Sequence, residues 1–169
     1  MKESSIIEIY TDGSCHTQSK TGAWAAILLI DGREVFLDGI EKQSTHNKME
    51  LLAIIEAIQF LQNKAIPWDG LRIYTDSQYA VQLVEREDRL RKQQFLTKTG
   101  RPIRNMELVQ NYLSTIASGD IQLIKVKAHQ KKGVSINYNR KVDQRVRKIM
   151  RREVRSTDEP KTNESTSEI

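Results

Sequence analysis

The 169-residue sequence lacks several features that define large classes of protein. No apolar run approaches the ~18 residues that a helix needs to cross a bilayer, and the first residues lack the apolar stretch of a secretory signal. Cys15 is the only cysteine, which excludes an intrachain disulfide and favours a reducing interior. No internal repeat is visible. These absences predict a cytosolic protein with one globular domain and no membrane partner.

Positive charge is distributed unevenly along the chain. The formal net charge is +5, but residues 125–155 hold twelve Lys or Arg against two acids, a local balance of +10. A second basic cluster, residues 86–104, is diluted by acids. Residues 156–169 have a balance of −3 and are expected to be a disordered tail after a domain of residues 1–155. Clustered cations suit a polyanion binder because neutralised phosphates release counterions, although solvated helix faces would also explain each cluster alone.

The first part of the chain alternates between strand and turn signals. Residues 4–10 predict a strand that ends in a turn at residues 11–14. Residues 21–30 predict a second strand. Asp31-Gly32 is a two-residue hairpin signal that leads into a third strand at residues 33–39. We therefore expect an antiparallel meander of three strands.

Beyond residue 46 the hydrophobic period becomes that of a helix. Apolar residues between positions 47 and 63 cover most of a helix surface, so this helix should be largely buried. The remaining pattern predicts strands at 71–75 and 121–126, and helices at 77–87, within 101–118 and from 139 to about 154. This order indicates an α/β protein whose mixed five-stranded sheet combines the meander with two parallel strands and is flanked by helices.

Four carboxylates fall where these elements could bring them together: Asp12, Glu50, Asp76 and Asp143. The first and third are expected at strand ends, where α/β sheets usually bind ligands. Each acid also has a local explanation. Asp12 could belong to a turn and Asp76 could cap a helix. Glu50 fits a capping-box-like spacing, and Asp143 could pair with Arg147. None of these explanations accounts for four acids at one sheet edge.

Clustered carboxylates repel one another and need cations. Their oxygen ligands favour Mg²⁺, with Mn²⁺ as a substitute, over zinc. Two such ions about 4 Å apart can stabilise the attacking and leaving oxygens of an in-line phosphoryl displacement. An acidic site within a basic protein suits a polyanionic substrate that metals bridge to the acids.

Five short motifs occur along the chain: YTDGS at 10–14, NKMEL at 47–51, YTDSQY at 74–79, VKAH at 126–129 and NRKVD at 139–143. Their order resembles that of type 1 ribonuclease H over about residues 5–150. LTKTGRPIRN at 96–105 also resembles retroviral ribonuclease H domains. The resemblance implies the ribonuclease H fold and an endonuclease that hydrolyses the RNA strand of RNA–DNA hybrids with two metal ions. Its products would carry 5′-phosphate and 3′-hydroxyl ends.

The resemblance also implies roles for individual residues. The four acids would bind the metals, and His129, in a basic loop, would assist proton transfer or product release. Another pair would grip a phosphate of the DNA strand, and a further set would contact RNA, partly through the ribose 2′-hydroxyls that distinguish RNA from DNA. The phosphate pair is Thr45 and Asn105, and the RNA-contacting set is Gln18, His46, Asn47 and Gln78.

Some positions depart from the family's pattern. His46 stands where Asn is common, and residues 16–22 replace a glycine-rich turn. The basic stretch 86–104 resembles a substrate-binding handle but lacks its usual tryptophans, since Trp24 and Trp68 lie elsewhere and are expected to be packing residues.

Two other functions compete with this interpretation. An exonuclease or strand-transfer enzyme of the same fold is disfavoured by the candidate ribose-reading residues. A non-catalytic nucleic-acid-binding module is disfavoured by the intact set of acids. We expect a monomer, and the initial Met and short acidic tail favour a free-standing enzyme over a domain of a polyprotein.

Overall fold

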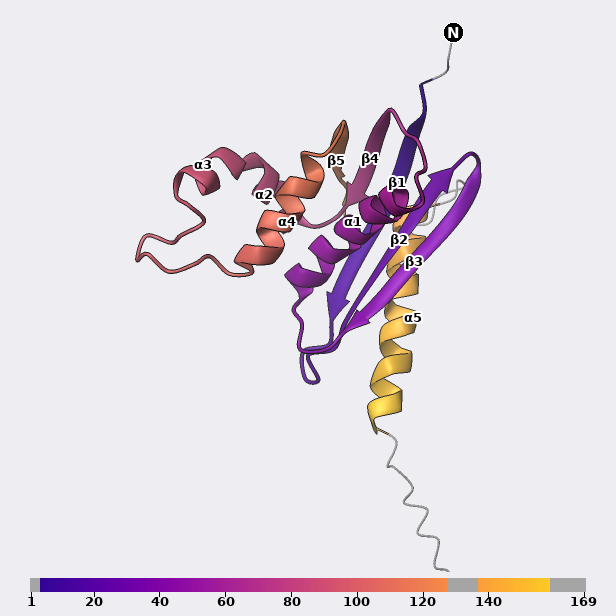
Figure 1. Ribbon diagram of the computed structural model, residues 1–169. Coiled ribbons are helices and arrows are strands. Elements are labelled where there is room, and N and C mark those ends of the chain that lie inside the picture. The colour runs from indigo at the N-terminus through magenta and orange to yellow at the C-terminus, as the bar shows by residue number, and fades with distance from the viewer. Residues whose placement is uncertain (1–3, 128–136, 159–169) are drawn as a thin grey trace, which may run out of the picture.

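A computed structural model describes residues 4–127 and 137–158 (Figure 1). The β3-β2-β1-β4-β5 sheet is antiparallel within the first three strands, and β4 runs parallel to β1 and β5. The predicted mixed five-stranded α/β sheet is confirmed. The elements in chain order are β1 (Ile6–Cys15), β2 (Gly22–Ile30), β3 (Arg33–Glu41), α1 (His46–Asn63), β4 (Gly70–Thr75), α2 (Gln78–Glu85), α3 (Glu87–Lys92), α4 (Met106–Ile116), β5 (Ile121–Lys125) and α5 (Tyr138–Asp158).

The turn between β2 and β3 is the predicted two-residue hairpin. Asp31 and Gly32 have φ values of 49° and 73°, as the two central residues of a type I′ turn require. Ile30 pairs with Arg33, so the two strands continue directly on either side of the turn.

β1 is longer than predicted and passes through the segment that the sequence suggested was a turn. Its pairing with β2 continues to Cys15, opposite Gly22. Gly13 therefore lies inside a strand. A Cβ at this position would lie 2.5 Å from the backbone nitrogen of Glu50, so the missing side chain lets α1 lie directly against β1. The turn prediction is wrong because an Asp-Gly pair favours a turn locally, whereas strand pairing and helix packing override that preference here.

Helices cover both faces of the sheet (Figure 1). α1 packs against β1 and β2 on one face and also contacts α4. α5 packs against the meander on the other face. The larger core includes Ile9, Leu51 and Ile58, and the smaller core under α5 includes Val142 and Val146. Full burial of such a side chain contributes about 1.5–3 kcal/mol. The prediction of a largely buried helix at 47–63 is confirmed by α1, and α5 buries an apolar stripe that includes Val142 and Val146.

Several boundaries differ from the expected ones. The predicted helix at 77–87 corresponds to α2, which ends at Glu85, and α3 follows after Arg86, mostly over residues for which the sequence pattern predicted no helix. α5 continues to Asp158, past the predicted domain boundary at residue 155, and residues 159–169 of the expected tail lie outside the described residues. Trp24 and Trp68 pack against the cores, as expected. None of the helices within residues 4–127 and 137–158 is long and apolar enough to cross a membrane.

Candidate active site

The parallel pairing of β1 and β4 brings Asp12 and Asp76 to the same point of the sheet. The register places Tyr10 beside Tyr74, and their rings stack with centroids 4.6 Å apart. Each aspartate follows its tyrosine by two residues. Because β4 ends at Thr75, the two carboxylates are neighbours where the two strands separate.

Glu50 reaches this point from the helix layer. It lies in the second turn of α1, and the absent side chain of Gly13 allows its backbone to approach β1. Its side chain is only 2% exposed, and its Oε1 lies 3.3 Å from Nε2 of His46. The other oxygen, Oε2, is buried without a hydrogen-bond partner among the described residues. The ligand atoms of Asp12, Glu50 and Asp76 all lie within 4.8 Å of one another.

The structure removes most of the local explanations for the acids. Thr45 caps α1, because its hydroxyl accepts a hydrogen bond from a backbone N–H of the first turn at 3.2 Å, so Glu50 is not part of a capping box. The serine that follows Asp76 caps α2 in the same way at 3.1 Å. Asp143 does form the expected ion pair with Arg147, with Nε and Oδ1 3.2 Å apart.

The electrostatics of the site are unfavourable without a cation. Burial, followed by the charges of Glu50, Asp76 and Asp143, raises the pKa of Asp12 to about 9. Burial also raises the pKa of Glu50, and the hydrogen bond from His46 opposes this only in part. That same hydrogen bond raises the pKa of His46. Hard carboxylate oxygens, one of them buried and without a partner among the described residues, are a donor set that suits Mg²⁺ or Mn²⁺.

Asp143 and the two strand aspartates line one cleft of about 510 Å³. Asp143 is outside the close group of three, but its charge contributes to the raised pKa of Asp12. The sequence showed a basic cluster around Asp143 without showing which cations face the acids. Arg147 and Arg151 could have been predicted to face the acids, because they follow Asp143 at successive four-residue spacings and so lie on the same side of the helix. The cations that line the cleft are Lys127, Arg140, Arg147, Lys148 and Arg151.

The residues expected to bind substrate lie at several loop and helix starts. Gln18 is exposed in the β1–β2 loop, and Asn47 and Gln78 are exposed in the first turns of α1 and α2. Thr45 and Asn105 precede α1 and α4. Within the described part of the chain, Nδ2 of Asn105 is buried and has no hydrogen-bond partner, so the structure leaves this donor unsatisfied at the start of α4.

Two further expectations have different outcomes. His46, expected to contact RNA, is 63% exposed in its side chain and hydrogen-bonds Glu50. The structure therefore gives it a contact within the acid group that the sequence did not indicate. His129 lies outside the described residues.

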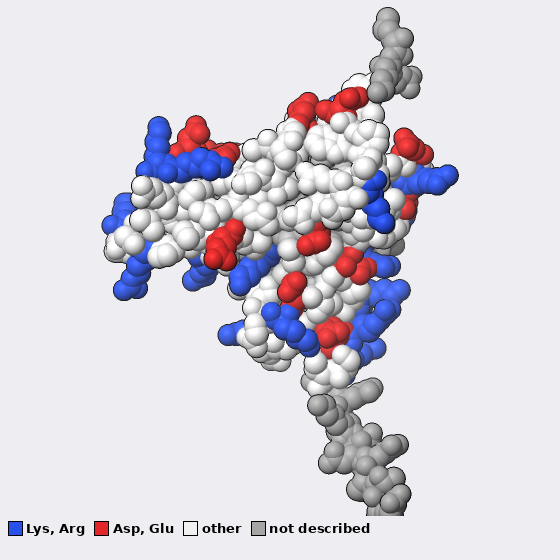
Figure 2. Space-filling model, in the orientation of Figure 1, with Lys and Arg blue, Asp and Glu red and all other residues white. Residues whose placement is uncertain are grey.

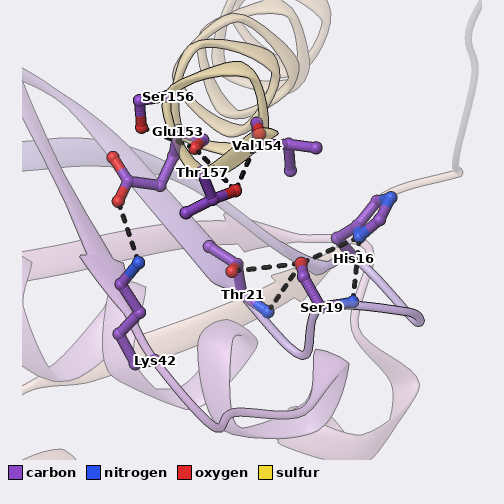
Figure 3. Close-up of polar contacts among 8 residues, drawn as sticks. All are labelled: His16, Ser19, Thr21, Lys42, Glu153, Val154, Ser156 and Thr157. Carbon is purple, nitrogen blue, oxygen red and sulfur yellow. Dashed lines mark hydrogen bonds and ion pairs between the residues drawn. The ribbon is translucent and has the colours of Figure 1, made fainter. Parts of the chain in front are cut away.

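A hydrogen-bond network orders the loop that carries Gln18 (Figure 3). Nδ1 of His16 accepts from the backbone N–H of Ser19 at 3.2 Å and lies 2.8 Å from its hydroxyl. The Ser19 hydroxyl also contacts that of Thr21 at 3.1 Å. Side chains thus organise the loop where a glycine-rich turn is common in similar sequences.

Comparisons with known proteins identify similar sequences and a similar fold. A model of the RNase H family matches residues 4–151, a range that contains all four acids. A Ribonuclease H of Thermoanaerobacter sp. (strain X514) is 32% identical over 126 residues, covering 73% of this chain and 79% of the relative. A Ribonuclease H of Caldicellulosiruptor saccharolyticus is 34% identical over 131 residues, covering 76% and 86%. The fold is shared with the crystal structure of LC9-RNase H1, a type 1 RNase H with the type 2 active-site motif. The TM-score is 0.72 at 19% identity, and the match covers 88% of this chain and 73% of that chain.

Proposed function

The chain belongs to the RNase H family of nucleases, and from this premise we propose that it is an endonuclease that hydrolyses the RNA strand of RNA–DNA hybrids. Membership confirms the resemblance that the five sequence motifs indicated. The observation that carries the proposal is the convergence of Asp12, Glu50 and Asp76 within 4.8 Å. A protein that only bound nucleic acid would gain nothing from negative charge concentrated in a cleft with basic walls.

We infer that these three acids and Asp143 hold two divalent ions, Mg²⁺ or Mn²⁺. Oε2 of Glu50 supports this, because it has no hydrogen-bond partner among the residues that the structure describes. A buried carboxylate oxygen needs a cation, a donor or a proton. When bound, the ions would supply activation of the attacking water and stabilisation of the leaving 3′ oxygen, which gives 5′-phosphate and 3′-hydroxyl ends. The chain holds the ligands on rigid elements, with His46 fixing one oxygen of Glu50. His129 remains our candidate for proton transfer or product release.

We propose that strand selection depends on two surfaces, one for each strand. Gln18, Asn47 and Gln78 are exposed donors and acceptors suited to ribose 2′-hydroxyls of the cut strand. Thr45 and Asn105, at the starts of two helices, suit a phosphate of the DNA strand. DNA duplex lacks the hydroxyls, and RNA duplex has a geometry that the DNA-strand site should accept poorly. Only the hybrid satisfies both surfaces.

A cleavage panel with Mg²⁺ tests the proposal. We expect cleavage of RNA in a labelled hybrid, and of a DNA strand within a short run of ribonucleotides paired to DNA. Pure duplexes and single-stranded RNA should survive. Glu50→Gln keeps the shape of the side chain but removes a ligand charge, so it should bind hybrid and cut almost none of it.

Each contrary result has a specific meaning. Equal cutting of DNA duplex and hybrid would favour a related nuclease of the same fold. Binding without any cleavage by the unmodified protein would favour a non-catalytic module. Normal cutting by Glu50→Gln would show that the acid group is not the active site.

A further inference from the structure

α5 presents three chemically different faces. One is apolar, with Val142 and Val146 buried under the sheet. The second contacts β3 through ion pairs, which we call the clamp face. The third lines the cleft that contains the acids, and the helical period places positions 143, 147 and 151 in one row along it. The α5 residues that line the cleft include Arg140, Asp143, Arg147, Lys148 and Arg151.

The cations of the clamp face are already neutralised by the protein. Lys141 Nζ lies 2.6 Å from Glu34, and Arg145 lies 2.7 Å from Asp38. Both cations also stand over the ring of Phe36, at 5.6 and 5.7 Å from its centroid. Lys42, directly after β3, forms a further ion pair with Glu153 in the last turns of α5 at 3.2 Å (Figure 3). This pair extends the contact between β3 and α5. These cations therefore stabilise the docking of α5.

The cleft face differs, because most of its cations form no ion pair within the part of the chain that the structure describes. Lys148 and Arg151 are exposed, and neither is in an ion pair within residues 4–127 and 137–158. Asp12 and Asp76 line the same cleft, yet no ion pair joins them to its cations within these ranges. Among the described residues, the cleft thus has acids at one point and cations beside them, of which only Arg147 is paired with an acid. Figure 2, which shows one side of the molecule, has Lys and Arg gathered along the α5 side as well as around α3.

We propose that Lys148 and Arg151, which we call the basic wall, bind backbone phosphates of the cut strand next to the scissile phosphate. The inference rests on the proposed function, which places the scissile phosphate at the acids. At 1.5 Å per residue, Arg151 lies ~12 Å along α5 from Asp143. Lys148 lies ~7.5 Å along α5 from Asp143. One strand of a duplex presents a phosphate about every 3.4 Å of its axis, so the wall faces the phosphates roughly two to four nucleotides from the position beside Asp143. The cut strand is favoured over its complement because the wall and the acids share one cleft.

The test compares two double variants that remove the same charge from the same helix. Lys148→Gln/Arg151→Gln removes the basic wall. Arg152→Gln/Arg155→Gln removes two exposed cations of α5 that do not line the cleft. Hybrid binding is measured by fluorescence anisotropy in EDTA over a range of salt concentrations. Loss of two phosphate contacts should weaken binding roughly tenfold and reduce the salt slope by about 1.8. The control pair should change the affinity less than about twofold, and the thermal midpoints of both variants should match the unmodified protein.

Uncharged methylphosphonate linkages, placed singly in either strand, locate the contacts. With the unmodified protein, neutral linkages roughly two to four nucleotides to one side of the cleavage position of the RNA strand should weaken binding. With Lys148→Gln/Arg151→Gln they should have no further effect. Equal behaviour of the two double variants, or sensitivity confined to the DNA strand, would overturn the inference. Cleavage of unmodified hybrid by the unmodified protein is scored separately, so failure of the proposed function is distinguishable from failure of the basic wall.

Discussion

Replacing Asp12 by Asn should stabilise the metal-free protein while abolishing cleavage. Burial and the charges of Glu50, Asp76 and Asp143 raise the pKa of Asp12 from 3.8 to about 9. Without metal, the folded protein must either take up a proton at this site or hold an unfavourable charge there. Asparagine has nearly the same shape and no charge, so the variant escapes this penalty.

The size of the effect depends on pH. A carboxyl whose pKa is higher in the folded than in the unfolded state loses stability as pH rises from its unfolded pKa through its folded pKa, here from 3.8 to about 9. At pH 7 the solution is about three pH units above the unfolded value, which limits the penalty to about 4 kcal/mol at 1.36 kcal/mol per unit. A domain of this size shifts its Tm by about 2–4 °C per kcal/mol, so the gain should not exceed roughly 8–16 °C.

Thermal unfolding followed by circular dichroism in EDTA at pH 5, 7 and 8.5 measures this gain. The difference in Tm between Asp12→Asn and the unmodified protein should widen with pH. Mg²⁺ should then raise the Tm of the unmodified protein more than that of the variant, because the ions bind the folded carboxylates. Asp88→Asn makes the same chemical change at an exposed position of α3 and should alter the stability by less than about 1 kcal/mol. A variant no more stable than the unmodified protein at pH 8.5 would refute the reasoning.

Three other changes test separate parts of the site. Gly13→Ala places a Cβ 2.5 Å from the backbone nitrogen of Glu50, so it should destabilise the fold by about 1–3 kcal/mol and greatly reduce cleavage. In the control Gly70→Ala the nearest heavy atom to the new Cβ is 3.6 Å away, so unfolding and cleavage assays should show neither effect. His46→Ala frees Oε1 of Glu50, so calorimetric titration should show weaker Mg²⁺ binding, and an unchanged affinity would show that the contact does not position the ligand. His129→Ala should slow turnover without abolishing it, and rates equal to those of the unmodified protein from pH 6 to 9 would exclude a role in proton transfer or product release.

Local signals in the sequence were sufficient to predict most of the fold. Asp31-Gly32 predicts its hairpin because few residue pairs accept two successive positive φ values. The apolar residues between positions 47 and 63 predict a buried helix because they cover most of the helix surface. The four acids were expected to converge because of their places on the predicted elements, two of them at strand ends. The five motifs in order then implied a metal-binding role for all four, and these individual roles stay predictions.

Other features depend on residues that are distant in the sequence. Asp12-Gly13 is compatible with a turn and with close packing of a strand under a helix, and the position of α1 decides between them. Asp12 and Asp76 lie next to each other only because of the register of β1 against β4. His46 and Glu50 are four residues apart, a spacing that is visible in the sequence. The Glu50 side chain is buried because α1 packs against β1, and the sequence does not show this burial.

The different contacts made by the faces of α5 show what the sequence alone does not determine. The sequence by itself determines that residues 125–155 are strongly basic and that Val142 and Val146 form an apolar stripe. Packing of that stripe under the sheet then fixes the rotation of the helix. As a result, Lys141 meets an acid of β3 that is 107 residues away, while Arg151 faces the cleft. Charge can be counted along the chain, but ion pairing depends on which face of a helix turns toward which surface, and only the tertiary structure decides that.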